Sequence, residues 1–416
     1  MKILVLGAGV VGTAAAYYLA RDGHEVTVVE RHAQAARGTS YSNAGLVSPG
    51  DATAWASPAA LKTFIKSLYT PDLGIKVRLG LDPYFYAWSF RFLLQCTNAR
   101  VRENTRAKLR LALYSRLCIN EITSETGIGY DQRARGIMYF FRSQQSLEHG
   151  AAMYGFLAEH GLDIEVVDRN RMAELEPGLA AARDGIAGAV FSPMDQTGDS
   201  RMFVEALAAH AEQKLGAKFM FDTTVEDLIV EGDRVVGVKA SAGRLNADAV
   251  VIAMGPESGL IGRRNGIDLP VYPVKGYTAT VTMDDPSKGP TMGGVDEDRL
   301  VAYSRLGDRL RLASTAEFTG FDRSHKPSDF TRLFETGKEL FPGAFDPAKA
   351  EVWAGLRPMM PGSVPVIGPA RYKGLYLDTG HGHVGWTMAC GSGRFLADLV
   401  AGRKPEIDPE GLVYRG

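Results

Sequence analysis

Cysteine is scarce in this chain of 416 residues, which has only Cys96, Cys118 and Cys390. The number is odd, and no two of the three have the CxxC spacing. This argues against a disulfide framework and against a zinc or iron–sulfur site, and it fits a reducing cytoplasm. We therefore expect buried, inert thiols and no bound metal.

A charge excess and a long apolar run are also missing. Lys and Arg total 47 against 48 Asp and Glu, so the net charge of -1 gives no reason to expect nucleic acid. The sequence contains no run of about eighteen apolar residues, so no transmembrane helix is predicted. The apolar N-terminus is interrupted by Gly7, Gly9 and Gly12 and continues into a second apolar strand, unlike a cleaved leader. We expect a cytoplasmic protein.

The length is too great for one hydrophobic core, so two closely associated domains are expected. Strand Lys2–Leu6, helix Val10–Arg21 and strand Glu25–Glu30 form a βαβ start, which predicts a parallel sheet. Residues 61–126 have a helical pattern. Further predicted strands are Gly136–Phe141, Gly188–Phe191, Lys218–Phe221, Arg234–Ala240, Ala249–Ala253 and Leu375–Thr379, with antiparallel strands across Pro270–Arg311. Further predicted helices are Arg201–Leu215, Ser328–Leu340 and one from Trp386 to about Ala401.

The expected fold class is α/β, with a Rossmann-like nucleotide-binding domain interleaved with an α+β substrate domain on an antiparallel sheet. The first domain is predicted to comprise residues 1–55, 195–262 and 345–416. The second is predicted to comprise residues 56–194 and 263–344.

The first glycine motif, Gly7-Ala8-Gly9-Val10-Val11-Gly12, lies between a predicted strand and a predicted helix. Gly7 permits the tight turn, Gly9 lets the backbone approach a pyrophosphate, and Gly12 allows close helix–strand packing. Glu30 closes the next strand, where its carboxylate would accept hydrogen bonds from ribose hydroxyls. The motif predicts dinucleotide binding, but by itself it leaves FAD and NAD open.

A second motif, Gly380-His381-Gly382-His383-Val384-Gly385, also follows a strand and precedes a helix. No strand with a ribose-binding acid follows it, so it is not a second nucleotide-binding unit. A helix N-terminus here would stabilise negative charge on a reduced flavin by about 1 kcal/mol, which favours FAD. With no second dinucleotide site, the electrons must leave to an external acceptor. Two histidines without other ligand residues are a weak metal signal.

Five segments resemble the D-amino acid dehydrogenase branch of the D-amino acid oxidase superfamily, which includes glycine oxidase and sarcosine oxidase. They occur in the family's order along the whole chain: Thr39–Gly45, Asp195–Asp199, Tyr272–Tyr277, Gly355–Met359 and Thr379–Gly393. In Gly355–Gly368 the sequence departs from the family pattern, with Met360, Gly362 and Ser363 in place of Thr, Asp and Gly.

The resemblance implies non-covalent FAD, since the Gly355–Gly368 region has no cysteine. It implies oxidation of a D-amino acid to an imino acid, which hydrolyses to a 2-oxo acid and ammonia. Electrons would pass to a quinone or another respiratory acceptor, with peripheral contact at the inner face of the cytoplasmic membrane. The aromatic stretch Tyr84–Phe92 would be a membrane-facing patch or, alternatively, part of the core. The two glycine loops and the resemblance together predict these cofactor-binding residues: Gly7, Ala8, Gly9, Val10, Val11, Gly12, Glu30, Arg31, Ser40, Asn43, Ala44, Gly45, Leu46, Val225, Gly255, Gly380, His381, Gly382, Val384, Gly385, Trp386 and Thr387.

The substrate carboxylate calls for an arginine, whose planar fork matches it bidentately. Arg305 occupies the position at which glycine oxidase-type relatives carry this arginine, and Arg309 and Arg311 are close enough to compete. Tyr277 would donate a phenolic hydrogen bond or be a core tyrosine. Arg357 would lie near the flavin or pair with a carboxylate.

Three other functions share these motifs. One is dehydrogenation of D-proline or cis-4-hydroxy-D-proline. A second is an oxygen-using glycine or sarcosine-type amine oxidase, and the third is a non-catalytic flavin subunit of a larger assembly.

Overall fold

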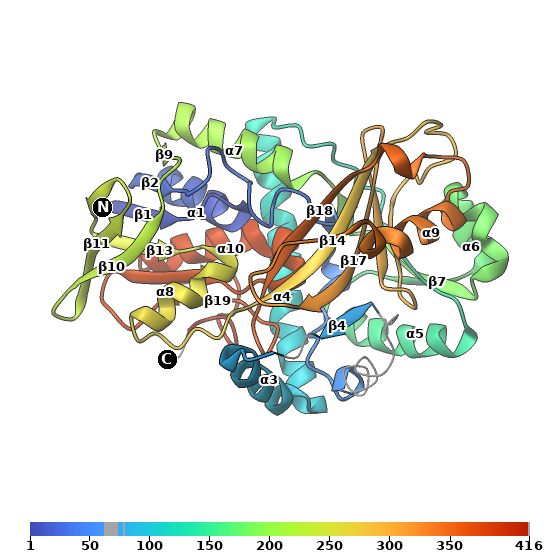
Figure 1. The fold of residues 1–416 in the computed structure, drawn as a ribbon, viewed down its shortest axis with the longest axis horizontal. Helices are drawn as coiled ribbons and strands as arrows, with labels where there is room; N and C mark the ends of the chain where they lie inside the picture. The colour runs from blue at the N-terminus through green and yellow to red at the C-terminus, as the bar shows by residue number, and fades with distance from the viewer. Residues whose placement is uncertain (62–73, 78–79, 415–416) are drawn as a thin grey trace.

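The computed structural model describes residues 1–61, 74–77 and 80–414. Two sheets organise the chain, one around the N-terminus and the other at the opposite end of the molecule (Figure 1). This confirms the α/β class. Of the segment expected to be helical, residues 62–73 and 78–79 lie outside the described residues.

The first sheet has six strands in the order β19-β20-β13-β1-β2-β9. The βαβ start is confirmed, since β1 pairs in parallel with both β2 and β13. Alternate side chains of β1 enter different cores: Ile3 and Val5 on one face, Leu4 and Leu6 on the other. A strand buried on both faces reads as a continuous apolar run, as observed. The strands are β1 (Lys2–Leu6), β2 (Glu25–Val29), β9 (Lys218–Met220), β13 (Ala249–Ile252), β19 (Val366–Pro369) and β20 (Leu375–Thr379).

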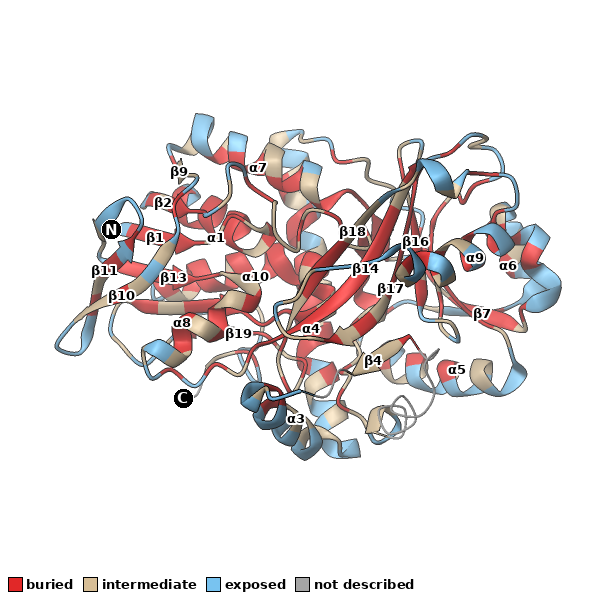
Figure 2. Cartoon of the chain, viewed as in Figure 1, coloured by how far each residue is buried: buried red, intermediate tan, exposed pale blue. Residues whose placement is uncertain are grey.

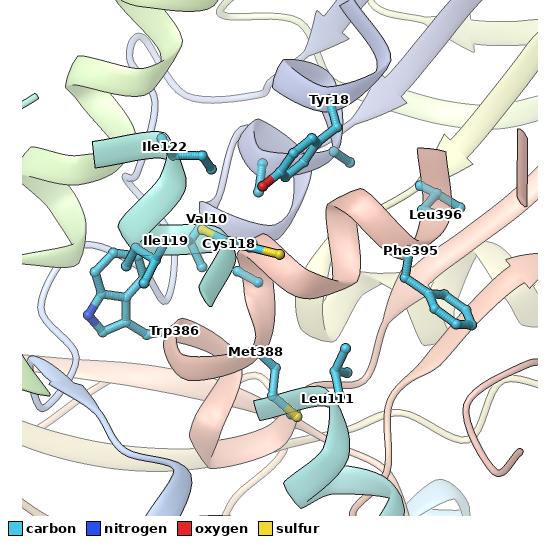
Figure 3. Close-up of a cluster of buried hydrophobic side chains, with 14 of the residues drawn as sticks. Val10, Tyr18, Leu111, Cys118, Ile119, Ile122, Trp386, Met388, Phe395 and Leu396 are labelled. Atoms are coloured by element: carbon cyan, nitrogen blue, oxygen red, sulfur yellow. The ribbon is translucent and has the colours of Figure 1, made fainter. Parts of the chain in front are cut away.

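Helices cover one face of this sheet and a small sheet covers the other. The helices α1 (Val10–Arg21), α4 (Asn98–Thr126) and α10 (Gly385–Val400) share a dry core in which Tyr18, Cys118 and Trp386 are buried (Figure 3). Helix α7 (Ser200–Leu215) packs beside α1. On the opposite face lie α8 (Ser258–Arg264) and the antiparallel strands β10 (Val225–Glu231), β11 (Arg234–Ala240) and β12 (Gly243–Asn246).

The second sheet has the order β18-β14-β17-β16-β15-β5-β7-β6, with β4 paired to β17. Helix α9 (Thr331–Leu340) packs on one face, as expected, and the opposite face is turned toward the first sheet (Figure 1). Pairing is mostly antiparallel, although β5 with β15 and β4 with β17 are parallel. The strands are β4 (Ile75–Val77), β5 (Ile137–Phe141), β6 (Glu165–Asp168), β7 (Gly188–Ser192), β14 (Tyr272–Thr282), β15 (Gly293–Asp296), β16 (Val301–Leu306), β17 (Arg309–Phe318) and β18 (Glu351–Met359).

Two expectations need correction. Strand β4 lies inside the segment expected to be helical, because Ile75–Val77 extends the edge of β17. Strand β18 falls within residues 345–416, yet it pairs along its whole length with β14 of the second sheet. We therefore propose that the return to the nucleotide-binding domain occurs after Met359. The remaining elements are the short pair β3 (Leu46–Val47) and β8 (Gln196–Thr197), and the helices α3 (Pro83–Gln95), α5 (Gln144–Ala158) and α6 (Arg169–Leu175).

Much of helix α3 is exposed (Figure 2), and several of its exposed residues are large and apolar. Its inner face buries Phe85 and Trp88. The outer apolar surface of α3, including Leu81 two residues before the helix, comprises Leu81, Tyr84, Tyr86, Phe90, Leu93 and Leu94. The aromatic stretch is therefore partly core and partly exposed. In the described residues no helix combines the length and the apolar character needed to cross a membrane.

Candidate active site

A large cavity of about 1570 Å³ lies between the two sheets. Its walls come from both glycine motifs, from the Gly38–Leu46 loop, from one face of the second sheet and from α3, α4 and α5. Elements far apart in the sequence meet here because the carboxyl ends of the parallel strands β1 and β13 open at the same sheet edge. Such a crevice is where open α/β sheets bind ligands.

The first glycine loop has the conformation that its sequence predicts. Gly7 has a φ of 103°, which a residue with a side chain rarely adopts. A Cβ at Gly12 would collide with the carbonyl oxygen of Gly7, so the helix can approach the strand this closely only with glycine. Gly9 lines the cavity, and the N–H of Val10 donates to Ser40 Oγ at 3.0 Å. The N-terminus of α1 thus offers backbone donors and a positive dipole end to an anion.

Glu30 lies at the carboxyl end of β2 and also lines the cavity. Its carboxylate accepts hydrogen bonds from the N–H groups of Ala8 at 2.8 Å and His32 at 3.0 Å. These two bonds fix the side chain beside the glycine loop. A carboxylate has about four acceptor positions, so roughly two are left for a ligand.

The second glycine loop forms the other end of the cavity. Gly380 and Gly382 have φ values of 83° and 63°, and the chain then enters α10 at Gly385. His381 is buried, its ring contacts Ser392 Oγ at 2.8 Å, and burial lowers its pKa to about 3. The ring is therefore neutral at ordinary pH and serves as a structural support for the loop.

Arg357 is the cationic side chain of β18 that lines the cavity. Its guanidinium lies across Gly276, where any Cβ would collide with it, and its Nη1 donates to the Thr315 carbonyl at 2.6 Å. Thr315 has a φ of 73°, unusual for a β-branched residue, at the irregularity where β14 and β17 shift register. This bulge turns the carbonyl toward Arg357. Burial lowers the pKa of Arg357 to about 10, so it remains a cation at neutral pH.

Comparison with known proteins identifies the family. The family model "DAO: FAD dependent oxidoreductase" matches residues 2–399. The chain belongs to this family.

Relatives and solved structures agree. The chain is 75% identical over 416 residues, the full length of both chains, to a protein named D-amino acid dehydrogenase 2 from Mesorhizobium japonicum. It is 43% identical over 413 residues, 99% of this chain and 98% of the relative, to a D-amino acid dehydrogenase from Paramagnetospirillum magneticum. Among solved structures, glycine oxidase from Geobacillus kaustophilus has the same fold, with a TM-score of 0.76 and 23% identity across 99% of this chain and 98% of that one.

The cavity of this FAD-dependent oxidoreductase fits its cofactor. The cradle of Gly7 and Gly12, the free acceptors of Glu30 and the start of α10 supply sites for pyrophosphate, ribose and the flavin edge. Of the predicted cofactor-binding residues, all line the cavity except Ala8, Gly12, Val384 and Thr387. Of those four, Val384 packs in the core, and Thr387 Oγ1 accepts a hydrogen bond from the N–H of Ser48 at 3.0 Å.

The segments Thr39–Gly45 and Asp195–Asp199 are joined by buried charge. Arg311 donates to the Asn43 carbonyl at 3.2 Å and to Asp199 at 3.2 Å, and Arg309 donates to Asp199 at 3.0 Å. Asp199 also caps the start of α7. Neither arginine lines the cavity; Arg311 ties the Thr39–Gly45 segment to Asp199, and Arg309 bonds to the same aspartate.

The expected position of Arg305 at the substrate carboxylate is corrected, because its side chain does not line the cavity. On β16 and the residue before it, Leu300 and Ala302 face the cavity, whereas Val301 and Tyr303 face the core beneath α9, and Arg305 is on the same side of the strand as Val301 and Tyr303. Its guanidinium donates to the carbonyls of Pro286, Pro290 and Gly307. Alternation along the strand thus turns the Arg305 side chain away from the cavity.

The expectation that Tyr277 donates a hydrogen bond in the site is corrected for the same reason. Gly276 and Thr278 line the cavity, whereas Tyr277 between them is buried on the opposite face of β14. Its hydroxyl donates to Glu317 at 2.5 Å, and burial raises its pKa. It is a core tyrosine, the alternative considered from the sequence.

Several cavity groups carried no sequence signal that marked them as functional. Asp51, Glu297 and His383 line the cavity, and Lys108 is buried behind Asp51. They come from four separate segments with no shared motif. The second glycine loop drew attention to His383, but no motif indicated Asp51, Lys108 or Glu297.

Proposed function

We propose that this oxidoreductase dehydrogenates a D-amino acid to an imino acid, which water then converts to a 2-oxo acid and ammonia. The observation that carries the proposal is Arg357, a half-buried cation facing the same cavity as both glycine loops. A bidentate site for a carboxylate beside a flavin suits an amino acid substrate. The full-length identity of 75% to a protein named as a D-amino acid dehydrogenase supports the same substrate class.

Bound FAD would accept the hydride from the substrate Cα. The protein's part is to bind and orient. Arg357 would hold the carboxylate, since one of its five donors bonds to Thr315 and about four remain. The sheet face formed by Gly276, Thr278 and Ala302 presents small side chains, which leaves room for the substrate. The N-terminus of α10 would favour negative charge at the nearby end of the cofactor by about 1 kcal/mol.

The test is anaerobic mixing of the holoenzyme with a panel of D-amino acids, including D-proline and cis-4-hydroxy-D-proline. D-amino acids should bleach the visible absorbance of the oxidised flavin, and their L-enantiomers should not. A panel in which no D-amino acid reduces the flavin would contradict the function and would favour a non-catalytic flavin subunit. Rapid peroxide formation in air would indicate an oxidase instead of a dehydrogenase.

We further propose that the electron acceptor is a membrane quinone and that the outer apolar surface of α3 contacts the bilayer. Six large apolar residues are exposed there, with Phe90 at 63% and Leu94 at 59%. Helix α3 also lines the cavity through Trp88, Phe92 and Leu93. A membrane-seated α3 would therefore bring the cavity wall next to the lipid phase where quinones dissolve.

Vesicle sedimentation tests this contact. A Phe90→Asp/Leu94→Asp variant should lose vesicle binding and turnover with a long-chain quinone, while its flavin is still reduced by the substrate. Val166→Asp, at another exposed apolar position far along the chain on β6, is the matched control. Equal vesicle binding by all three proteins would contradict the membrane contact.

A further inference from the structure

The segment Ser48–Trp55 has little regular structure, yet it is fixed to the rest of the molecule at successive positions. Side chains of other elements bond to its backbone, and all of these bonds come from residues more than 50 positions away in the sequence. The bonds are Ser48 N–H to Thr387 Oγ1, Gly50 N–H to Asp195, Asp51 carbonyl from His383 Nε2, Thr53 carbonyl from Lys108 Nζ, Ala54 N–H to Thr105 Oγ1, and Trp55 N–H to Ser363 Oγ. A loop held this firmly positions whatever side chain it presents.

The side chain presented is Asp51. It lines the cavity, and 39% of its side-chain surface is exposed there. Its backbone carbonyl accepts from His383 Nε2 at 3.1 Å, while the nearest carboxylate oxygen is 3.8 Å from that nitrogen. Within the described part of the chain, no hydrogen bond to the carboxylate is present. The group is therefore anchored through its backbone and open through its side chain.

Asp51 and Arg357 line the same cavity and attract each other, but no direct ion pair joins them among the described residues. A carboxylate and a guanidinium held apart in one cavity match the ammonium and carboxylate ends of an amino acid. We propose that Asp51 completes a clamp for the zwitterion: Arg357 binds the α-carboxylate, and Asp51 binds the α-ammonium group and accepts its proton. The inference rests on the proposed function.

The proton transfer supplies what hydride transfer requires. The N–H bond of the ammonium breaks, an O–H bond forms on Asp51, and the nitrogen keeps its electron pair to assist departure of the Cα hydride. No oxidant or reductant takes part in this step. The proton leaves to water after the product departs.

The surroundings suit this role. Burial raises the pKa of Asp51 above that of an ordinary aspartate, opposed by Lys108 and Arg357. The carboxylate is thus ionised at neutral pH but a stronger base than an ordinary aspartate. His383, stacked on Trp55 with ring centroids 4.6 Å apart, has a pKa well below its usual value and does not compete for the proton. The titratable groups around Asp51 are Lys108, Tyr139, Tyr154, Asp195, Glu297, Arg357 and His383.

The test is the pH profile of anaerobic flavin reduction, measured as kcat/KM for a neutral D-amino acid such as D-alanine. In the wild type, kcat/KM should fall on the acid side of neutrality and be flat from about pH 7 to about pH 9, because Asp51 removes the proton. In Asp51→Asn only the free amine reacts, so kcat/KM should be about 10- to 100-fold lower near neutral pH and rise about tenfold per pH unit. Asp51→Glu should restore the flat profile in part. Asp163→Asn, an exposed aspartate away from the cavity, is the matched control.

Three results would overturn the assignment. One is a wild-type profile that already rises tenfold per pH unit, which needs no variant to interpret. A second is a uniform loss in Asp51→Asn with an unchanged profile. The third is a loss confined to substrates with a cationic side chain, which would make Asp51 a side-chain recognition residue. Failure of the proposed function appears differently, since then the wild-type flavin would not be reduced by any D-amino acid.

Discussion

Arg357→Gln should abolish the preference for a carboxylate over an amide at the substrate's α-carbon. In the wild type, one Arg357 donor is committed to the Thr315 carbonyl at 2.6 Å, which leaves enough donors for a bidentate bond. Hydrogen bonds to charged groups contribute about 1.5–3 kcal/mol each. Two such bonds correspond to a preference of roughly 10²- to 10⁴-fold for a D-amino acid over its amide.

The assay is anaerobic flavin reduction by D-alanine and by D-alaninamide, each with the wild type and the variant. The four kcat/KM values form a double-mutant cycle between protein and substrate. The acid-to-amide ratio should fall to within about tenfold of unity in Arg357→Gln. Because the pKa of Arg357 is about 10, the wild-type ratio should be constant at neutral pH and decline as the pH approaches that value.

This test needs a check of the variant's stability and a control variant. Loss of the Thr315 bond costs about 1–3 kcal/mol of stability, so flavin content and Tm must be recorded for the variant. Arg305→Lys is the control, since Arg305 faces away from the cavity and should give the wild-type ratio. An Arg357→Gln enzyme that keeps the wild-type ratio would refute the assignment of Arg357.

Three further outcomes concern the cofactor. Glu30→Gln should weaken FAD binding by roughly 5- to 30-fold, since a charge-assisted acceptor becomes a neutral one, and equilibrium dialysis measures it; unchanged affinity would remove Glu30 from the ribose site. Gly12→Ala should cost about 1–3 kcal/mol or more, because the new Cβ meets the Gly7 carbonyl, and should purify with little flavin and a lower Tm; normal flavin content would contradict the close packing. Acid or heat denaturation should release all the flavin into the supernatant, as the cysteines Cys96, Cys118 and Cys390 lie outside the cavity wall; flavin that stays with the pellet after washing would indicate a covalent link.

Local pattern was sufficient for the nucleotide-binding half of the site. The conformations of Gly7 and Gly12 and the place of Glu30 follow from a strand–turn–helix whose residues are neighbours in the sequence. The second glycine loop was equally readable, because Gly380–Gly385 also joins consecutive elements. In both cases the chemistry depends on backbone geometry that a short segment determines by itself.

The substrate half could not be read in the same way. On strands β14 and β16, a shift of one residue exchanges the cavity face for the core face, so the sequence could not show that Tyr277 and Arg305 lie on the faces turned away from the cavity. The bulge at Thr315, which directs Arg357, depends on pairing between strands more than thirty residues apart.

The sequence alone thus determined the fold class, the cofactor and the family to which the chain belongs, since each is encoded in contiguous motifs. Only the tertiary structure showed that Arg357 lines the cavity and Arg305 does not. It also brought Asp51, Lys108, Glu297 and His383 together from four separate segments. The physical reason is that a side chain's environment depends on strand register and long-range packing, whereas a glycine turn carries its geometry with it.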